Sequence, residues 1–122
     1  MPVRVVVVED NDVFREALVL MLGMREEVEV VAAVGDGSTA LTAVLEHRPD
    51  VVLIDYRMPG LDGVETTTEL RAQLPEVAVV ALTASADAAQ QQELLAAGAV
   101  ACLGKDEELD EIVAAIQKAA ST

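Results

Sequence analysis

The sequence predicts a doubly wound α/β domain, in which a five-stranded parallel sheet is covered by helices on both faces. Five stretches are rich in β-branched residues and almost continuously apolar, at residues 3–10, 28–35, 50–55, 77–84 and 99–105. Strands of this kind are typical of parallel sheets that are buried on both sides. Stretches compatible with helices separate them, and this alternation with short connections predicts right-handed β-α-β crossovers.

Three of the intervening or following segments carry apolar residues at helical spacing. In the first segment these are Phe14, Ala17, Leu18, Met21 and Leu22. In the second they are Ala40, Leu41, Val44 and Leu45. In the last they are Leu109, Ile112, Val113 and Ile116. The spacing predicts amphipathic helices whose apolar faces pack on the sheet.

The two remaining helices are predicted from weaker patterns, at residues 62–73 and 87–98. The first is rather polar, and the residues that the second offers for burial are Leu94, Leu95 and Ala97. Gly98 is expected to end that helix, because glycine readily adopts the positive φ that often follows a helix. The short polar side chains expected to cap helix starts are Asp12, Ser38, Asp62 and Asp87.

Length and composition indicate one folded domain over residues 1–122, with no linker or second domain. The chain is 52% apolar but only 2% aromatic, so its core must be aliphatic. No apolar run approaches the roughly 20 residues that cross a membrane. Cys102 is the single cysteine, so no internal disulfide indicates an oxidising compartment, and the cytoplasm is the expected location.

The formal net charge of −14, from 22 acidic and 8 basic residues, argues against some classes of partner. An acidic surface repels phosphate backbones and anionic membranes, so this chain is not expected to bind nucleic acid or membrane directly. Cations and basic protein surfaces are the partners that such a domain attracts.

Polar residues follow four of the five apolar stretches, where each strand is expected to end. Glu9 and Asp10 follow the first strand, and Asp55, Thr83 and Lys105 end the third, fourth and fifth. Ligands of open parallel sheets bind outside the carboxyl ends of the strands. With the strand order 2-1-3-4-5, these four ends are neighbours. Three clustered carboxylates repel one another unless a cation is present, which predicts a Mg²⁺ site.

These strand-end residues, together with the stretch after Asp55, resemble the receiver domain of bacterial two-component response regulators. The resemblance covers essentially the whole chain and implies the flavodoxin-like (βα)5 fold of that family. Its motif residues are Glu9, Asp10, Asp55, Met58, Pro59, Asp62, Gly63, Thr83, Ala84 and Lys105. The ending "GKDEELDEIVAAI" is most similar to NarL/FixJ-type receivers, which usually precede a LuxR-type, helix-turn-helix DNA-binding domain.

The resemblance implies a role for each residue at the predicted edge. Asp55 would accept a phosphoryl group from the phosphohistidine of a sensor histidine kinase. Lys105 and Thr83 would contact the phosphoryl oxygens. The ligands of Mg²⁺ would be Glu9, Asp10, Asp55 and the main-chain carbonyl of Arg57.

The resemblance also implies a switch controlled by phosphorylation. The domain would catalyse its own phosphorylation and a slow dephosphorylation, and would not be a conventional turnover enzyme. The new charge would alter the face formed by the fourth helix, the fifth strand and the fifth helix. Transcription would be controlled through a DNA-binding domain beyond residue 122, and a homodimer formed on phosphorylation is a further expectation.

Two positions depart from the family pattern. Most receivers carry Tyr or Phe three residues before the lysine, and the ring rotates inward on activation. This chain has Cys102 there, which puts aromatic-gated coupling in doubt. The lysine is followed by Asp106 and not by proline, and the sequence leaves the isomer of the Lys105–Asp106 bond open, since a cis bond without proline costs about 2.5–4 kcal/mol.

Three alternatives share the topology or the chemistry. A small Mg²⁺-dependent phosphohydrolase with an Asp nucleophile usually needs a second Asp two residues on, where this chain has Arg57. A flavodoxin-like cofactor carrier needs a hydroxyl-rich phosphate loop after the first strand, where "EDND" would repel a phosphate. A pseudo-receiver that binds partners without phosphorylation stays open because of Cys102.

Overall fold

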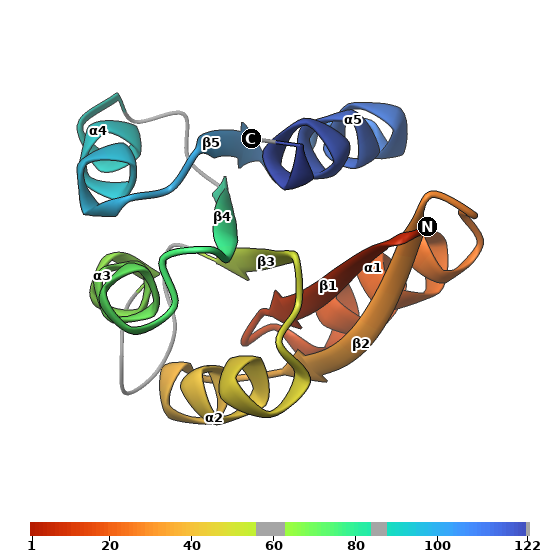
Figure 1. The fold of residues 1–122 in the computed structure, drawn as a ribbon. Coiled ribbons are helices and arrows are strands. Elements are labelled where there is room, and N and C mark those ends of the chain that lie inside the picture. Colours follow the sequence, from red (N-terminus) through yellow and green to blue (C-terminus); the bar gives the residue numbers. More distant parts are fainter. Residues whose placement is uncertain (56–62, 84–87, 122) are drawn as a thin grey trace.

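The computed structural model describes residues 1–55, 63–83 and 88–121. Within these ranges strands and helices alternate along the chain, as Figure 1 shows. The strands are β1 (Val3–Val8), β2 (Val28–Val34), β3 (Val51–Asp55), β4 (Ala78–Thr83) and β5 (Ala101–Gly104). The helices are α1 (Asp12–Gly23), α2 (Gly37–His47), α3 (Gly63–Gln73), α4 (Ala88–Ala97) and α5 (Leu109–Ala120). None of the described helices is long and apolar enough to cross a membrane.

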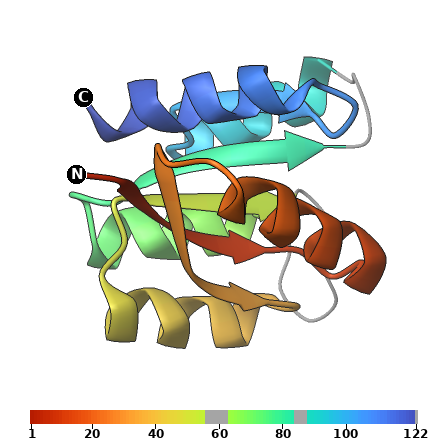
Figure 2. The same cartoon turned by 90° about the vertical axis from the view of Figure 1, so that its right-hand side faces the viewer.

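The strands form one parallel sheet in the order β2-β1-β3-β4-β5, which confirms the predicted topology. The register pairs Val8 with Ile54 and Thr83 with Gly104, so the strands end close to one another. In Figure 2 the strand arrows point the same way, and their carboxyl ends lie along one edge of the sheet. This edge is where the sequence predicts a site.

Helices cover both faces of the sheet. α2, α3 and α4 lie on one face, and α1 and α5 lie on the other (Figure 1). Alternate residues of β3 belong to opposite layers: Val52 and Ile54 pack on one side, and Val51 and Leu53 pack on the other. All residues of β3 and β4 are buried, which explains why these strands read as continuous apolar runs.

Two predicted helix caps are wrong by one or two residues. Asn11 caps α1, because its side-chain oxygen accepts the Phe14 backbone N–H at 2.9 Å. Asp36 caps α2 because its side chain accepts a hydrogen bond from the backbone N–H of Thr39 at 2.8 Å. This hydrogen bond is the main cause that lowers the pKa of Asp36. The expected caps, Asp12 and Ser38, follow these residues and already belong to the helices. The other two, Asp62 and Asp87, lie outside the described residues.

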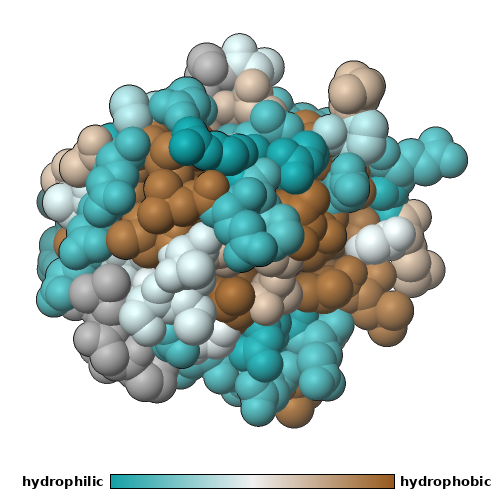
Figure 3. Space-filling model, turned by 60° about the horizontal axis from the view of Figure 1, so that its bottom comes forward, coloured by the Kyte–Doolittle hydropathy of each residue, from teal (hydrophilic) through white to brown (hydrophobic). Residues whose placement is uncertain are grey.

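The predicted apolar faces are partly confirmed. Leu18 and Leu22 of α1 are buried, as are Ile112, Val113 and Ile116 of α5. Leu95 of α4 was expected to be buried but is 48% exposed, and Leu45 of α2 is 41% exposed. Apolar side chains also reach the surface in separate patches between polar ones, on the face that Figure 3 presents.

Gly98 ends α4 with a positive φ of 120°, as predicted. A side chain at this position would collide with the aliphatic stem of Arg71, because an added Cβ would lie 2.5 Å from Cγ of Arg71. The glycine is therefore required both by the backbone conformation and by the close approach of α3.

Candidate functional site

The structure brings the predicted strand-end residues together at the carboxyl edge of the sheet. Glu9 and Asp10 follow β1, Asp55 is the last residue of β3, Thr83 is the last residue of β4, and Lys105 follows β5. β1, β3, β4 and β5 are consecutive in the sheet, so residues far apart in sequence meet here. Arg57 lies outside the described residues.

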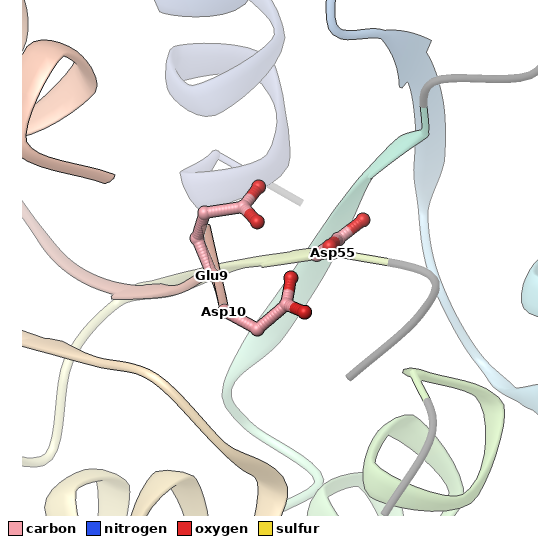
Figure 4. Close-up of side chains that lie close together, drawn as sticks. All are labelled: Glu9, Asp10 and Asp55. Carbon is pink, nitrogen blue, oxygen red and sulfur yellow. The ribbon is translucent and has the colours of Figure 1, made fainter. Parts of the chain in front are cut away.

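Three carboxylates form the acidic part of this edge. Glu9, Asp10 and Asp55 each offer an oxygen, and these oxygens all lie within 4.8 Å of one another. Figure 4 shows Glu9 and Asp10 at the end of β1 beside Asp55 at the end of β3. Glu9 is 2% exposed and Asp55 is 7% exposed, whereas Asp10 is exposed. The trio thus combines two buried carboxylates with one that faces solvent.

Lys105 supplies the positive charge of the site. Its Nζ lies 2.7 Å from Glu9 Oε1 and 3.3 Å from Asp55 Oδ2, and its side chain is 18% exposed. Its backbone N–H donates to the Thr83 carbonyl at 2.9 Å, which ties the end of β5 to the end of β4. The same Nζ lies 4.8 Å from the centre of the Phe14 ring, within the range of a cation–π contact. One ammonium therefore faces two carboxylates and a ring.

The pKa values of Asp55 and Lys105 reflect both burial and the excess of negative charge at the site. Burial is the main cause that raises the pKa of Asp55, from its ordinary 3.8 to about 7, and the charge of Glu9 adds to it. The Lys105 ammonium opposes this rise only in part. For Lys105 itself burial alone would lower the pKa, but its hydrogen bonds and charge interactions with Glu9 and Asp55 outweigh burial and raise it. A divalent cation fits a site with this balance.

Every polar group of Glu9 has a partner. Its backbone N–H donates to the Val34 carbonyl at 2.9 Å. Its carbonyl accepts from Arg15 Nη1 at 2.7 Å. Its side-chain Oε2 accepts the Asn11 backbone N–H at 3.0 Å, and Oε1 faces Lys105. Burying this carboxylate is tolerated because it is paired and hydrogen-bonded on all sides.

Sequence reasoning missed two residues of the site, Phe14 and Arg15. The helical spacing places Phe14 on the apolar face of α1, and it does pack on the core formed by α1 and α5. Its ring also faces Lys105, a contact that joins residues 91 positions apart. The only available signal was the position of both residues in the first turn of a helix that starts at this edge of the sheet.

The positions that depart from the family pattern lie next to the site. Cys102 is in β5, where it pairs with Ala81, and it is half-buried against the layer of α2, α3 and α4. Burial raises the pKa of its thiol. The described residues contain no cis peptide bond, so the Lys105–Asp106 bond is trans.

A family model for the response regulator receiver domain matches residues 5–117. The chain belongs to this family. The match spans both halves of the receiver site, from the acidic pair after β1 to the lysine after β5. It also removes the grounds for the phosphohydrolase and cofactor-carrier alternatives.

Receivers of transcription regulators are among the similar proteins. The transcriptional regulatory protein LnrK of Bacillus subtilis (strain 168) is 40% identical over 114 residues, which cover 93% of this chain and 52% of LnrK. The probable transcriptional regulatory protein NarL of Mycobacterium tuberculosis (strain ATCC 25618 / H37Rv) is also 40% identical over 114 residues, 93% of this chain and 53% of NarL. The chain thus spans about half the length of these curated relatives.

A solved receiver has nearly the same fold. The signal receiver domain of NarL from Mycobacterium tuberculosis superposes with a TM-score of 0.94 at 38% identity, covering 98% of this chain and 97% of that chain. The expected resemblance to NarL-type receivers is therefore confirmed for the fold and for the family.

Proposed function

We propose that this receiver accepts a phosphoryl group on Asp55 from the phosphohistidine of a sensor histidine kinase, with Mg²⁺ as the cofactor. The observation that carries the proposal is the position of Asp55. Its carboxylate stands at the end of a fully buried central strand, within 4.8 Å of the Glu9 and Asp10 oxygens and 3.3 Å from Lys105 Nζ. A nucleophile on such a strand is held rigidly.

In the proposed reaction an Asp55 oxygen forms a bond to phosphorus while the bond from phosphorus to the kinase histidine nitrogen breaks. The nitrogen keeps the bonding electron pair, and Asp55 becomes an acyl phosphate. Carboxylates are weak nucleophiles, so catalysis depends on positioning and on neutralising charge. Asp55 must be ionised to attack, and burial first and the charge of Glu9 second raise its pKa and so disfavour ionisation.

The residues that would hold Mg²⁺ are Glu9, Asp10, Asp55 and the main-chain carbonyl of Arg57. The ion would neutralise phosphoryl oxygens and the carboxylates that face them. Lys105 would release one of its carboxylates and donate to a phosphoryl oxygen, and the Thr83 hydroxyl would donate to another. Thr83 is 3% exposed and is the last residue of β4, at this edge of the sheet.

Mass spectrometry of the intact protein tests the proposal. Acetyl phosphate and Mg²⁺ are expected to add the mass of one phosphoryl group, which hydroxylamine removes because it cleaves acyl phosphates. Asp55→Asn is expected to gain nothing. No gain in the wild type, or an equal gain in the variant, would remove Asp55 as the acceptor.

The similarity to transcriptional regulatory proteins supports a proposal for the process that this receiver controls. We propose that the chain is the receiver of a transcription regulator in the cytoplasm, whose DNA-binding domain lies beyond residue 122. Phosphorylation would alter the face formed by α4, β5 and α5 and would favour a homodimer. The trigger would be a movement of Thr83, the last residue of β4, and of Lys105, which follows β5.

A phosphorylation-independent pseudo-receiver is the second candidate. The observation that favours it is Cys102, which leaves β5 without the usual switch aromatic. This candidate predicts partner binding that is unchanged by acetyl phosphate and by Asp55→Asn. Binding that depends on phosphorylation would eliminate it.

A further inference from the structure

The side chain of Arg15 joins two segments beside the acidic trio. Arg15 is the fourth residue of α1, and its side chain is 21% exposed. Nη1 donates to the Glu9 main-chain carbonyl at 2.7 Å, and Nη2 donates to Asp12 Oδ1 at 2.6 Å. The planar guanidinium thus spans the end of β1 and the first turn of α1, which a single ammonium could not do with the same geometry.

A third segment leaves room for this arrangement. A Cβ added to Gly35, in the turn after β2, would lie 3.1 Å from Arg15 Nη1 and 3.8 Å from the Glu9 carbonyl oxygen. The distance of 3.1 Å to Nη1 is tighter than ordinary van der Waals contact. The absence of a side chain at Gly35 therefore lets the guanidinium reach the carbonyl that it binds.

The carbonyl in question belongs to the peptide group between Glu9 and Asp10. Because a peptide group is planar, holding its carbonyl also fixes the backbone from which the Asp10 side chain projects. The Glu9 side chain is held independently by Asn11 and Lys105. The Asp10 side chain is exposed. Among the described residues, Arg15 is the side chain that holds the peptide group from which Asp10 projects.

We infer that Arg15 is a positioning residue for the acidic pair, and that it orients the Glu9–Asp10 peptide so that both carboxylates meet Asp55. The inference rests on the proposed function, since it concerns how the chain presents ligands to Mg²⁺. Arg15 itself touches neither the ion nor the phosphoryl group. Residues that orient metal ligands typically contribute roughly 10–100-fold to metal affinity.

Charge and positioning predict opposite results at this residue. A cation near the site repels Mg²⁺, and its loss would leave Asp12 unpaired, so a purely electrostatic role predicts tighter binding after Arg15→Gln. A positioning role predicts weaker binding after Arg15→Gln and also after Arg15→Lys, which keeps the charge. The two substitutions together separate the two roles.

The experiment is a calorimetric titration with MgCl₂ of the wild type, Arg15→Gln and Arg15→Lys, at one pH and ionic strength. Both variants are expected to bind Mg²⁺ about tenfold more weakly. Tighter binding by Arg15→Gln with unchanged binding by Arg15→Lys would overturn the inference, and so would unchanged binding by both. If the wild type binds no Mg²⁺, the proposed function fails and not only the role of Arg15.

Arg71→Gln is the matched control. Arg71 also donates to main-chain carbonyls, those of Pro75 and Val77 at 2.6 and 2.7 Å, but at the amino end of β4. Its loss is expected to lower stability without changing the Mg²⁺ affinity. An equal loss of affinity in Arg71→Gln would assign the effect to general destabilisation and overturn the inference.

A second variant decides the question if the Arg15 variants do not fold. Gly35→Ala places a methyl group against Nη1 and is expected to weaken Mg²⁺ binding two- to threefold, with a shifted Asp10 amide signal in the metal-free NMR spectrum. Unchanged binding together with an unshifted Asp10 amide would contradict the inference. This readout does not depend on phosphorylation.

Discussion

Replacing Asp55 by asparagine is expected to stabilise the metal-free domain near neutral pH. Burial, and after it the charge of Glu9, raises the pKa of Asp55 from 3.8 to about 7, so the folded state holds a proton that the unfolded chain releases near pH 4. As the pH rises from about 4 to about 7, the unfolded state is therefore favoured progressively. Above pH 7 both states are ionised, and the penalty is fully present.

The size of this effect follows from the shift in pKa. About three pKa units at about 1.4 kcal/mol each correspond to about 4 kcal/mol at most. The observed value is expected to be smaller, about 2–4 kcal/mol, because Lys105 and Glu9 can readjust as Asp55 ionises. Asparagine keeps the shape of the protonated carboxyl group and does not titrate, so it avoids the penalty.

Urea unfolding in EDTA at pH 5, 6, 7 and 8 measures the prediction. The difference in unfolding free energy between Asp55→Asn and the wild type is expected to grow between pH 5 and 7 and then to level off. Repulsion among the other acidic residues affects both proteins and cancels in the difference. Mg²⁺ is expected to narrow the difference, because it stabilises the wild type by binding the folded state. Parallel pH profiles in EDTA would refute the reasoning.

Three further substitutions test single contacts. Lys105→Met removes the ammonium that faces two carboxylates, so the Mg²⁺ affinity measured by calorimetry is expected to rise roughly tenfold. Phosphorylation of this variant is expected to be slower. An equal rise in affinity in Lys118→Met, on the exposed end of α5, would contradict a specific effect of Lys105. Thr67→Val removes a buried hydroxyl that has no hydrogen-bond partner among the described residues, and it is expected to raise the unfolding free energy by about 1 kcal/mol. Thr68→Val, which loses a hydrogen bond to the Val64 carbonyl, is not expected to raise it. Phe14→Leu removes the ring that faces Lys105 and is expected to slow phosphorylation about three- to tenfold. Phe14→Tyr keeps a ring and is expected to keep the wild-type rate. Equal phosphorylation rates in the two variants would count against a role for the ring.

The sheet and its edge could be predicted because each depends on local pattern. β3 is continuously apolar and ends in Asp55, and both facts are visible in a few adjacent residues. Once the strand order is assumed, the meeting of Glu9, Asp55 and Lys105 follows from topology. The family motifs added the chemistry that the pattern alone leaves open.

The missed features depend on geometry that adjacent residues do not encode. Asn11 and Asp12 are both good caps by composition, and only the backbone conformation selects Asn11. Arg15 reaches Glu9 because the turn at Gly35 comes close, which no spacing in the sequence reveals. Leu95 is exposed because α4 covers the edge strand β5, which is itself only half-buried.

The short distance between Lys105 and Glu9 limits how an activated form can be imitated. A glutamate at position 55 would extend the carboxylate without adding charge, and the ammonium already has a buried carboxylate at 2.7 Å. It would gain little by leaving Glu9, so Thr83 and the β5 end would receive no new pull. Designers of a permanently active regulator from this chain would need a doubly charged group at residue 55, or a change at Glu9 that frees the lysine first.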